Sequence, residues 1–176
     1  MQIQILTTRF NNDTWTENCD YKERNGIKGC IYGSATKIKW AIPLNILVFI
    51  IEMNNSTNHI EGIGLVRNFT HFDKYYKIYD SGTYNRYVYK SDYRIDRSCL
   101  QVELMEILEK ICFKGKTHLK RGIGFTSIPE KLKRNIESCE FDIEKCIKTE
   151  FIEKFGKSTL EIDKSHKKKR KLIIIG

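Results

Sequence analysis

The sequence predicts an α+β fold, in which a small β-barrel in the N-terminal half is followed by helices. Short alternating or β-branched segments fill the first half of the chain, whereas apolar residues recur at helical spacing after Ser98. Strands and helices segregated in this way favour α+β over alternating α/β architecture. Many short strands, glycines within them and one strong hairpin favour a small barrel.

The first predicted strand spans residues 1–6, where polar and apolar side chains alternate. The polar stretch from Thr7 to Asn25 is interpreted as a loop or a short helix. Two further short strands are predicted at residues 30–33 and 38–42.

A hairpin is the clearest local prediction. Residues 46–53 form a β-branched and aromatic run typical of a buried central strand, and residues 59–66 form the returning strand. Residues 54–58 between them are rich in turn formers. Gly62 and Gly64 lie two apart on one face, which indicates a close approach to the backbone or a sharp bend there.

The next segment, Tyr75 to Tyr93, contains seven tyrosines. Residues 75–79 and 87–89 are predicted to be strands around a turn at 80–83. Tyrosines on strands are often core residues, so packing is one interpretation of this segment.

Helices are predicted in the second half. Leu100, Leu104, Leu108 and Ile111 follow helical spacing, and Ser98 with Gln101 forms a capping-box pattern. Ser127 and Pro129 are predicted to open a second helix. A third is marked by apolar residues from 143 to 155, with Gly156 as its stop. The predicted division is residues 1–97 for the β-rich part, 98–163 for helices packing on it, and 164–176 for a basic tail.

The formal net charge of +9 favours polyanionic partners, nucleic acid above all. None of the six cysteines forms a C-x-x-C pair, so we expect no metal, and no motif indicates a cofactor. No secretory signal is recognised, which predicts an intracellular protein with reduced thiols. The longest apolar stretch, Ile46 to Ile51, is too short for a membrane span.

Two basic segments are candidate phosphate-binding sites. The first combines cations with glycines at 115, 122 and 124, and its candidate residues are Lys114, Lys116, His118, Lys120 and Arg121. The second is the tail, with candidates Lys167, Lys168, Lys169 and Arg170. An exposed connection between two helices, a solvated tail and a nuclear import signal remain as alternatives.

Aromatic and cationic residues also alternate at Tyr84, Arg86 and Tyr87. Base stacking with backbone neutralisation is how single strands are commonly held, so these three residues are candidate contacts. Catalytic residues are not predicted, because the four histidines are scattered and no nucleophile motif occurs. A Cys112–His118 pair is one catalytic alternative, and a nuclease-like or base-modifying enzyme is a third class of function, but we expect a binding protein rather than an enzyme.

The N-terminal half, roughly residues 1–95, resembles the PUA-like barrels, especially their EVE, YTH and ASCH branches. The resemblance rests on the opening strand at 3–6, on Trp15, on Gly29–Gly33, on the turn-then-strand at 43–52 and on Ile60–Val66. It implies a barrel that binds RNA or modified bases in an aromatic pocket. Trp15, Ser34 and Trp40 are then the candidate pocket residues, with ordinary core packing as the alternative for the tryptophans.

The chain is also similar in pattern to uncharacterised proteins of large DNA viruses, notably in Tyr84–Lys90 and Lys114–Gly122. The leading prediction is a nucleic-acid-binding module whose partner is RNA or DNA. The alternative is a structural or minor virion protein that packs against other capsid or core subunits.

Overall fold

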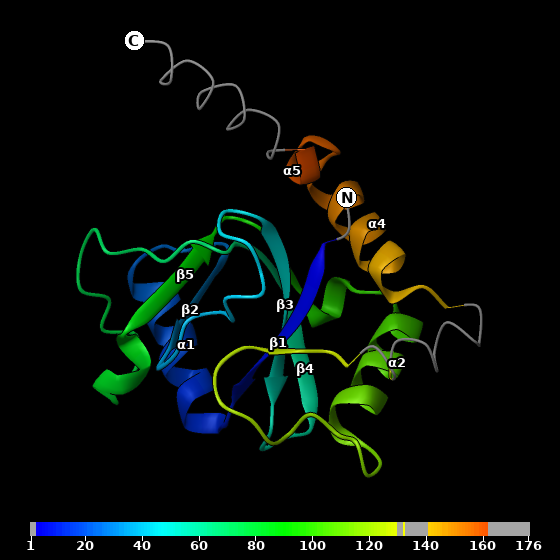
Figure 1. Cartoon of the computed structure of the whole chain (residues 1–176), viewed down its shortest axis with the longest axis horizontal. Helices are drawn as coiled ribbons and strands as arrows, with labels where there is room; N and C mark the ends of the chain where they lie inside the picture. Colours follow the sequence, from blue (N-terminus) through cyan, green and yellow to red (C-terminus); the bar gives the residue numbers. More distant parts are fainter. Residues whose placement is uncertain (1–2, 130–131, 133–140, 162–176) are drawn as a thin grey trace.

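A mixed five-stranded sheet, in the order β6-β4-β3-β1-β7, forms the centre of the structure (Figure 1). The computed structural model describes residues 3–129, 132 and 141–161. β1 and β3 pair in parallel, whereas the other neighbours in this sheet are antiparallel. A second, two-stranded sheet is formed by β2 and β5. The strands are β1 (Gln4–Phe10), β2 (Cys30–Ser34), β3 (Leu47–Asn54), β4 (His59–Arg67), β5 (Tyr87–Ser91), β6 (Arg94–Asp96) and β7 (Thr126–Ser127).

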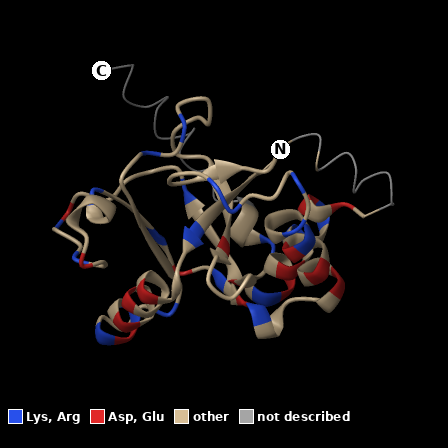
Figure 2. Ribbon diagram, turned by 90° about the horizontal axis from the view of Figure 1, so that it is seen from below, with Lys and Arg blue, Asp and Glu red and all other residues tan. Residues whose placement is uncertain are grey.

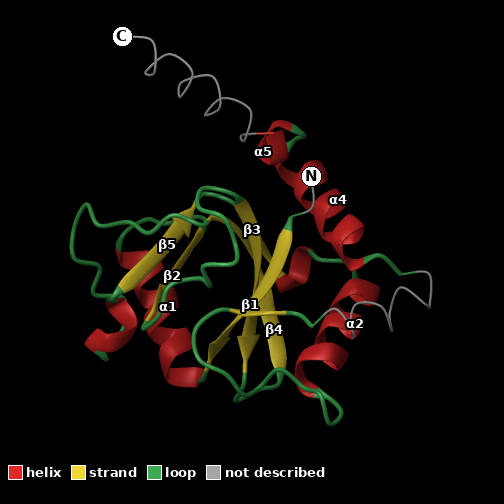
Figure 3. Ribbon diagram, in the orientation of Figure 1, coloured by secondary structure: helices red, strands yellow, loops and turns green. Residues whose placement is uncertain are grey.

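Helices cover the sheet on both sides, and the α+β prediction is confirmed. In Figure 3, α1 and the β2–β5 ribbon lie on one side of the central sheet, and α2 and α4 lie on the other. The described strands form two sheets and no closed barrel, which differs from the predicted barrel. The helices are α1 (Asn12–Arg24), α2 (Val102–Phe113), α4 (Ile143–Phe155) and α5 (Ser158–Glu161), with 3₁₀ turns η1 (Gly82–Asn85) and η2 (Arg97–Cys99).

β3 is buried along its whole length, as predicted for a central strand. Its side chains alternate between two hydrophobic cores because successive residues of a strand point to opposite faces. Phe49 and Ile51 join the core under α2 and α4. Val48 and Ile50 join the core under α1 and the β2–β5 ribbon.

The predicted hairpin is formed by β3 and β4. Its turn uses Asn58 at a φ of 58°, a left-handed conformation that asparagine tolerates better than most residues. A β-bulge interrupts the pairing between Glu52 and Met53.

Gly62 and Gly64 make room for a buried polar network beneath β4. A Cβ atom at Gly64 would overlap the hydroxyl oxygen of Tyr32, and one at Gly62 would lie 2.8 Å from Nη2 of Arg94. Tyr32 donates to Oε1 of Glu52 at 2.7 Å, and Arg94 donates from Nη2 to Oε2 of Glu52 at 2.7 Å. The close approach predicted from the two glycines is therefore made by the protein itself, by these side chains and by the backbone of β6 at Ile95.

Several local predictions differ from the structure. Residues 38–42 and 75–79 are not strands, although Ile38, Ile42 and Tyr79 are buried. α1 is longer than expected, because Asn11 and Thr14 cap each other's backbone N–H at its start. α2 begins at Val102 without a side-chain cap, and Ser98 instead belongs to η2, where Asp96 accepts its N–H.

The third predicted helix is confirmed as α4. The side chain of Asp142 accepts the N–H of Lys145 at 2.9 Å, and Gly156 ends the helix at a φ of 86°. The predicted second helix falls mostly on residues outside the described part, but Ser127 at its expected start belongs to β7. The second half of the chain thus contributes an edge strand to the sheet of the first half. None of the described helices has the length and apolar character needed to cross a membrane.

Candidate functional site

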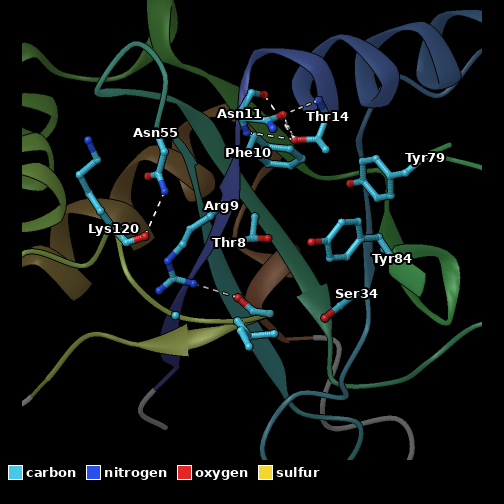
Figure 4. A pocket seen from close by; sticks show the side chains of 14 residues that line it. Thr8, Arg9, Phe10, Asn11, Thr14, Ser34, Asn55, Tyr79, Tyr84 and Lys120 are labelled. Atoms are coloured by element: carbon cyan, nitrogen blue, oxygen red, sulfur yellow. Dashed lines mark hydrogen bonds between the residues drawn. The ribbon is translucent and has the colours of Figure 1, made fainter. Parts of the chain in front are cut away.

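A pocket lies where β1 and β2 end, beside the segment 119–124 (Figure 4). We call it the β1–β2 pocket. Its volume is about 280 Å³. Five stretches of chain that are distant in sequence meet there. The lining residues are Thr8, Arg9, Phe10, Asn11, Thr14, Gly33, Ser34, Asn55, Tyr79, Tyr84, Lys120, Gly122, Ile123 and Gly124.

Arg9 fastens the 119–124 segment to β1. Its Nε donates to the carbonyl oxygen of Leu119 at 2.7 Å, and its Nη1 donates to that of Gly124 at 3.1 Å. Asn55 contributes a third hydrogen bond, from its Nδ2 to the carbonyl oxygen of Lys120 at 3.0 Å. Burial lowers the pKa of the Arg9 guanidinium. These bonds hold one wall of the pocket in place.

Glycine is required where this segment passes β2. Gly124 has a φ of 63°, and a Cβ atom there would lie 2.6 Å from Oγ1 of Thr36 and 2.9 Å from Oγ of Ser34. A larger residue would be strained at this φ and would crowd the hydroxyl groups of Thr36 and Ser34.

Tyrosines form the opposite wall. The rings of Tyr79 and Tyr84 make an edge-to-face contact with centroids 6.3 Å apart. Tyr79 is buried, accepts a hydrogen bond from Nδ2 of Asn18 at 3.1 Å, and has its pKa raised by burial. Tyr84 is 45% exposed, so its ring is available to a ligand. Figure 4 shows the hydroxyl groups of Tyr84 and Thr8 pointing towards one another across the pocket.

The electrostatic character of the pocket is positive. Its fourteen lining residues include two cations, Arg9 and Lys120, and no aspartate or glutamate. Acidic residues gather on the helices instead, as Figure 2 shows. Oδ1 of Asn55 is buried and has no hydrogen-bond partner in the part of the chain that the structure describes. The pocket therefore offers aromatic faces, hydroxyl groups and a positive field to a polar or anionic ligand.

Three residues predicted from the sequence line this pocket. Ser34, Tyr84 and Lys120 come from β2, η1 and the 119–124 segment. The two predicted tryptophans do not line it. Trp15 packs edge-on against Phe10, with centroids 5.1 Å apart, and Trp40 is 96% exposed to solvent.

The other predicted residues lie around the pocket or away from it. Lys114, Lys116 and Arg121 are exposed, and Nδ1 of His118 accepts the N–H of Lys120. Arg86 lies over the ring of Tyr87, 5.4 Å from its centroid. The tail candidates Lys167, Lys168, Lys169 and Arg170 lie outside the described residues.

Sequence reasoning missed Thr8, Arg9, Asn55 and Tyr79 as pocket residues. Thr8 and Arg9 belong to β1, which runs four residues beyond the predicted strand. Thr7 and Thr8 are buried, although two consecutive polar residues in a sequence suggest the end of a strand. The sequence therefore gave no sign that β1 continues beyond Leu6. Asn55 was assigned to a turn, where asparagine needs no further explanation.

The geometry does not favour the Cys112–His118 pair as a catalytic site. Cys112 is buried, and burial raises the pKa of its thiol to about 12, so the thiolate is scarce at neutral pH. His118 is engaged with the backbone of Lys120. Among the described residues, no group of three or more histidine, cysteine, aspartate or glutamate side chains is arranged to hold a metal ion.

No known protein family, curated protein or solved structure matches this chain.

Proposed function

We propose that this protein is a nucleic-acid-binding module that holds one unstacked base, of RNA or of DNA, in the β1–β2 pocket. The observation that carries the proposal is the composition of the pocket wall: aromatic rings and hydroxyl groups surround a positively charged space without a carboxylate. Such a wall suits a polar, planar group attached to phosphate.

The size of the pocket supports one base rather than a larger ligand. Its volume of about 280 Å³ lies just below the range of about 300–1,000 Å³ that small-molecule sites occupy. The exposed face of Tyr84 offers a stacking platform, worth about 1–3 kcal/mol per base. Thr8 and Ser34 offer hydroxyl groups that both donate and accept, which suits the edge of a natural or a modified base.

The proposed kinship with PUA-like barrels has the support of the residue patterns and of the order of elements. A strand, a helix, a short strand and a hairpin follow one another in β1, α1, β2 and β3–β4. The kinship is proposed without a closed barrel, since the described strands form two sheets. We further propose that the protein acts inside the cell or, given its resemblance to proteins of large DNA viruses, in a virion.

A structural role in a virion is the second candidate. The exposure of Trp40, at 96%, and of Leu44, at 77%, favours it, because neighbouring exposed apolar side chains are typical of protein interfaces. If this candidate is right, substitution of Trp40 weakens assembly with other subunits and leaves nucleic-acid binding unchanged.

Matched aromatic substitutions test the proposed base pocket. Tyr84→Ala should weaken binding of a labelled single-stranded oligonucleotide about 5- to 150-fold and change its base preference, because one stacking platform is lost. Trp40→Ala removes an exposed aromatic residue outside the pocket and should leave both unchanged. Equal effects of the two variants, or none, would contradict the proposal.

A further inference from the structure

A second cavity, which we call the basic cleft, lies at the other end of β2 from the β1–β2 pocket. Its volume is about 970 Å³. Cys30, the first residue of β2, lines the cleft, whereas Ser34, the last, lines the pocket. Four residues of strand span about 13 Å at the usual rise of ~3.3 Å per residue. The two cavities are therefore neighbours along one short strand.

Cations from separate parts of the chain converge on the basic cleft. Five of its fifteen lining residues are basic, and Asp92 is the one acidic residue among them. The five basic residues come from the α1–β2 connection, the 69–79 loop, β5, β6 and the end of α4. The basic residues are Lys28, Lys74, Lys90, Arg94 and Lys154.

Three of these cations have no acidic partner among the residues that the structure describes. Arg94 is neutralised by Glu52 and Asp96, and Lys90 lies 4.0 Å from a carboxylate oxygen of Asp73. Lys28, Lys74 and Lys154 form no ion pair with any carboxylate in residues 3–129, 132 and 141–161, and all three are exposed. Like charges held together in this way repel one another unless an anion lies between them.

Tyr76 organises two of the lysines. The ammonium groups of Lys74 and Lys90 lie 5.2 Å and 4.9 Å from the centroid of its ring, and Lys90 also donates to its hydroxyl oxygen at 2.6 Å. Tyr76 in turn donates to the carboxylate of Asp73, at 2.7 Å from Oδ1. Contacts with Tyr76 therefore hold Lys74 and Lys90 beside one another at the cleft.

The loop that supplies His71 and Lys74 to the cleft also presents aromatic rings to solvent. Phe69, Phe72 and Tyr75 are exposed by 52%, 67% and 68%. Exposed aromatic residues next to a cationic groove are the combination that holds single-stranded nucleic acid, by stacking and by backbone neutralisation. A duplex presents no unstacked bases to such rings.

From these contacts we propose that the basic cleft binds the phosphodiester backbone of a single strand, with Lys28, Lys74 and Lys154 contacting its phosphate oxygens. The inference rests on the proposed function, since it assigns the path of the same nucleic acid whose base occupies the β1–β2 pocket. The strand runs along the β2–β5 ribbon from the pocket to the cleft.

The salt dependence of binding tests this path. The triple variant Lys28→Gln, Lys74→Gln, Lys154→Gln is compared with the control Lys39→Gln, Lys110→Gln, Lys145→Gln, which removes the same charge from exposed lysines outside both cavities. The affinity for a labelled single-stranded oligonucleotide is measured from about 50 mM to about 200 mM salt. The cleft variant should flatten the slope of log K against log salt by about two units, at ~0.7 per phosphate contact, and the control should not.

Two other results overturn the proposal, and a third separates it from the proposed base pocket. If the two triple variants have equal slopes of log K against log salt, only the overall charge of the protein matters, and the cleft assignment is wrong. The proposed base pocket is then still tested by Tyr84→Ala. If inorganic tripolyphosphate binds the wild type but not the cleft variant, while oligonucleotide binding is the same in both, the cleft is a site for small polyphosphates. If the cleft variant has the flatter slope but Tyr84→Ala binds as the wild type does, the cleft assignment is supported and the proposed base pocket is contradicted.

Discussion

Nε of Arg9 donates to the carbonyl oxygen of Leu119 across 2.7 Å, and so joins β1 to a segment 110 residues later in the chain. The same guanidinium holds Gly124. Arg9→Met keeps much of the side-chain volume and removes these bonds. We expect a loss of about 1.5–3 kcal/mol in unfolding free energy, as for hydrogen bonds to a charged group, measured by urea denaturation.

Hydrogen exchange locates this effect. The amides of residues 119–124 should exchange faster in Arg9→Met, because the segment loses its anchor. The exposed Arg24 is the control, and Arg24→Met should leave this segment protected. Unchanged protection in Arg9→Met would show that Asn55 and the glycine conformations suffice.

Gly64 and Tyr32 are expected to be energetically coupled. Gly64→Ala places a methyl group against the Tyr32 hydroxyl and should cost about 1–3 kcal/mol. Tyr32→Phe removes that hydroxyl, so the double variant should lose less stability than the sum of the single variants. Gly82→Ala, where a Cβ atom meets nothing closer than 3.7 Å, is the control and should change little. Additivity within about 0.5 kcal/mol would contradict the coupling.

The cysteines should differ widely in reactivity. Burial raises the pKa of Cys30 to about 11 and that of Cys112 to about 12, whereas Cys99 is exposed. Reaction with iodoacetamide near neutral pH, followed by peptide mass spectrometry, should modify Cys99 at least about 100-fold faster than Cys30 or Cys112, because the thiolate reacts. Addition of urea should abolish the difference. Rapid modification of Cys30 in the native protein would contradict its burial.

His71 should make the fold sensitive to mild acid. Burial lowers the pKa of its imidazole, and the charge of Lys90 adds to this effect, while Asp73 acts in the opposite direction. Because the pKa of His71 is lower in the folded than in the unfolded protein, its contribution to the free energy of unfolding is fully present above the unfolded-state pKa of about 6.5. This contribution is lost as the pH falls through the folded-state pKa. His71→Gln should remove this part of the pH dependence in urea unfolding measured between about pH 7.5 and about pH 5. The same pH dependence in both proteins would exclude His71 as its source.

The parts of the fold that were predictable are local in sequence. The β3–β4 hairpin and α4 follow from apolar periodicity, turn formers and a stop glycine within one segment. The parallel pairing of β1 with β3 and the addition of β7 to β1 join distant segments. No local pattern encodes such pairings, and they produce an open sheet where a barrel was expected.

The candidate site shows the same division. Tyr84 and Lys120 were recognisable because their residue types fit a base and a phosphate, and Ser34 was implied by the resemblance to PUA-like barrels. Trp40 was implied by the same resemblance, but it is exposed because its connection packs Ile38 and Ile42 inward instead. Arg9 was missed because its partners, Leu119 and Gly124, are close to it only in the folded chain.

The most direct test of nucleic-acid binding is a fluorescence anisotropy titration of the wild-type protein with a labelled single-stranded oligonucleotide, as RNA and as DNA, at several salt concentrations. With phosphate contacts from Lys120 and the basic cleft, affinity should fall steeply, by at least about 10-fold between about 50 mM and about 200 mM salt. Binding that is absent, or that does not change with salt, would contradict the proposed function.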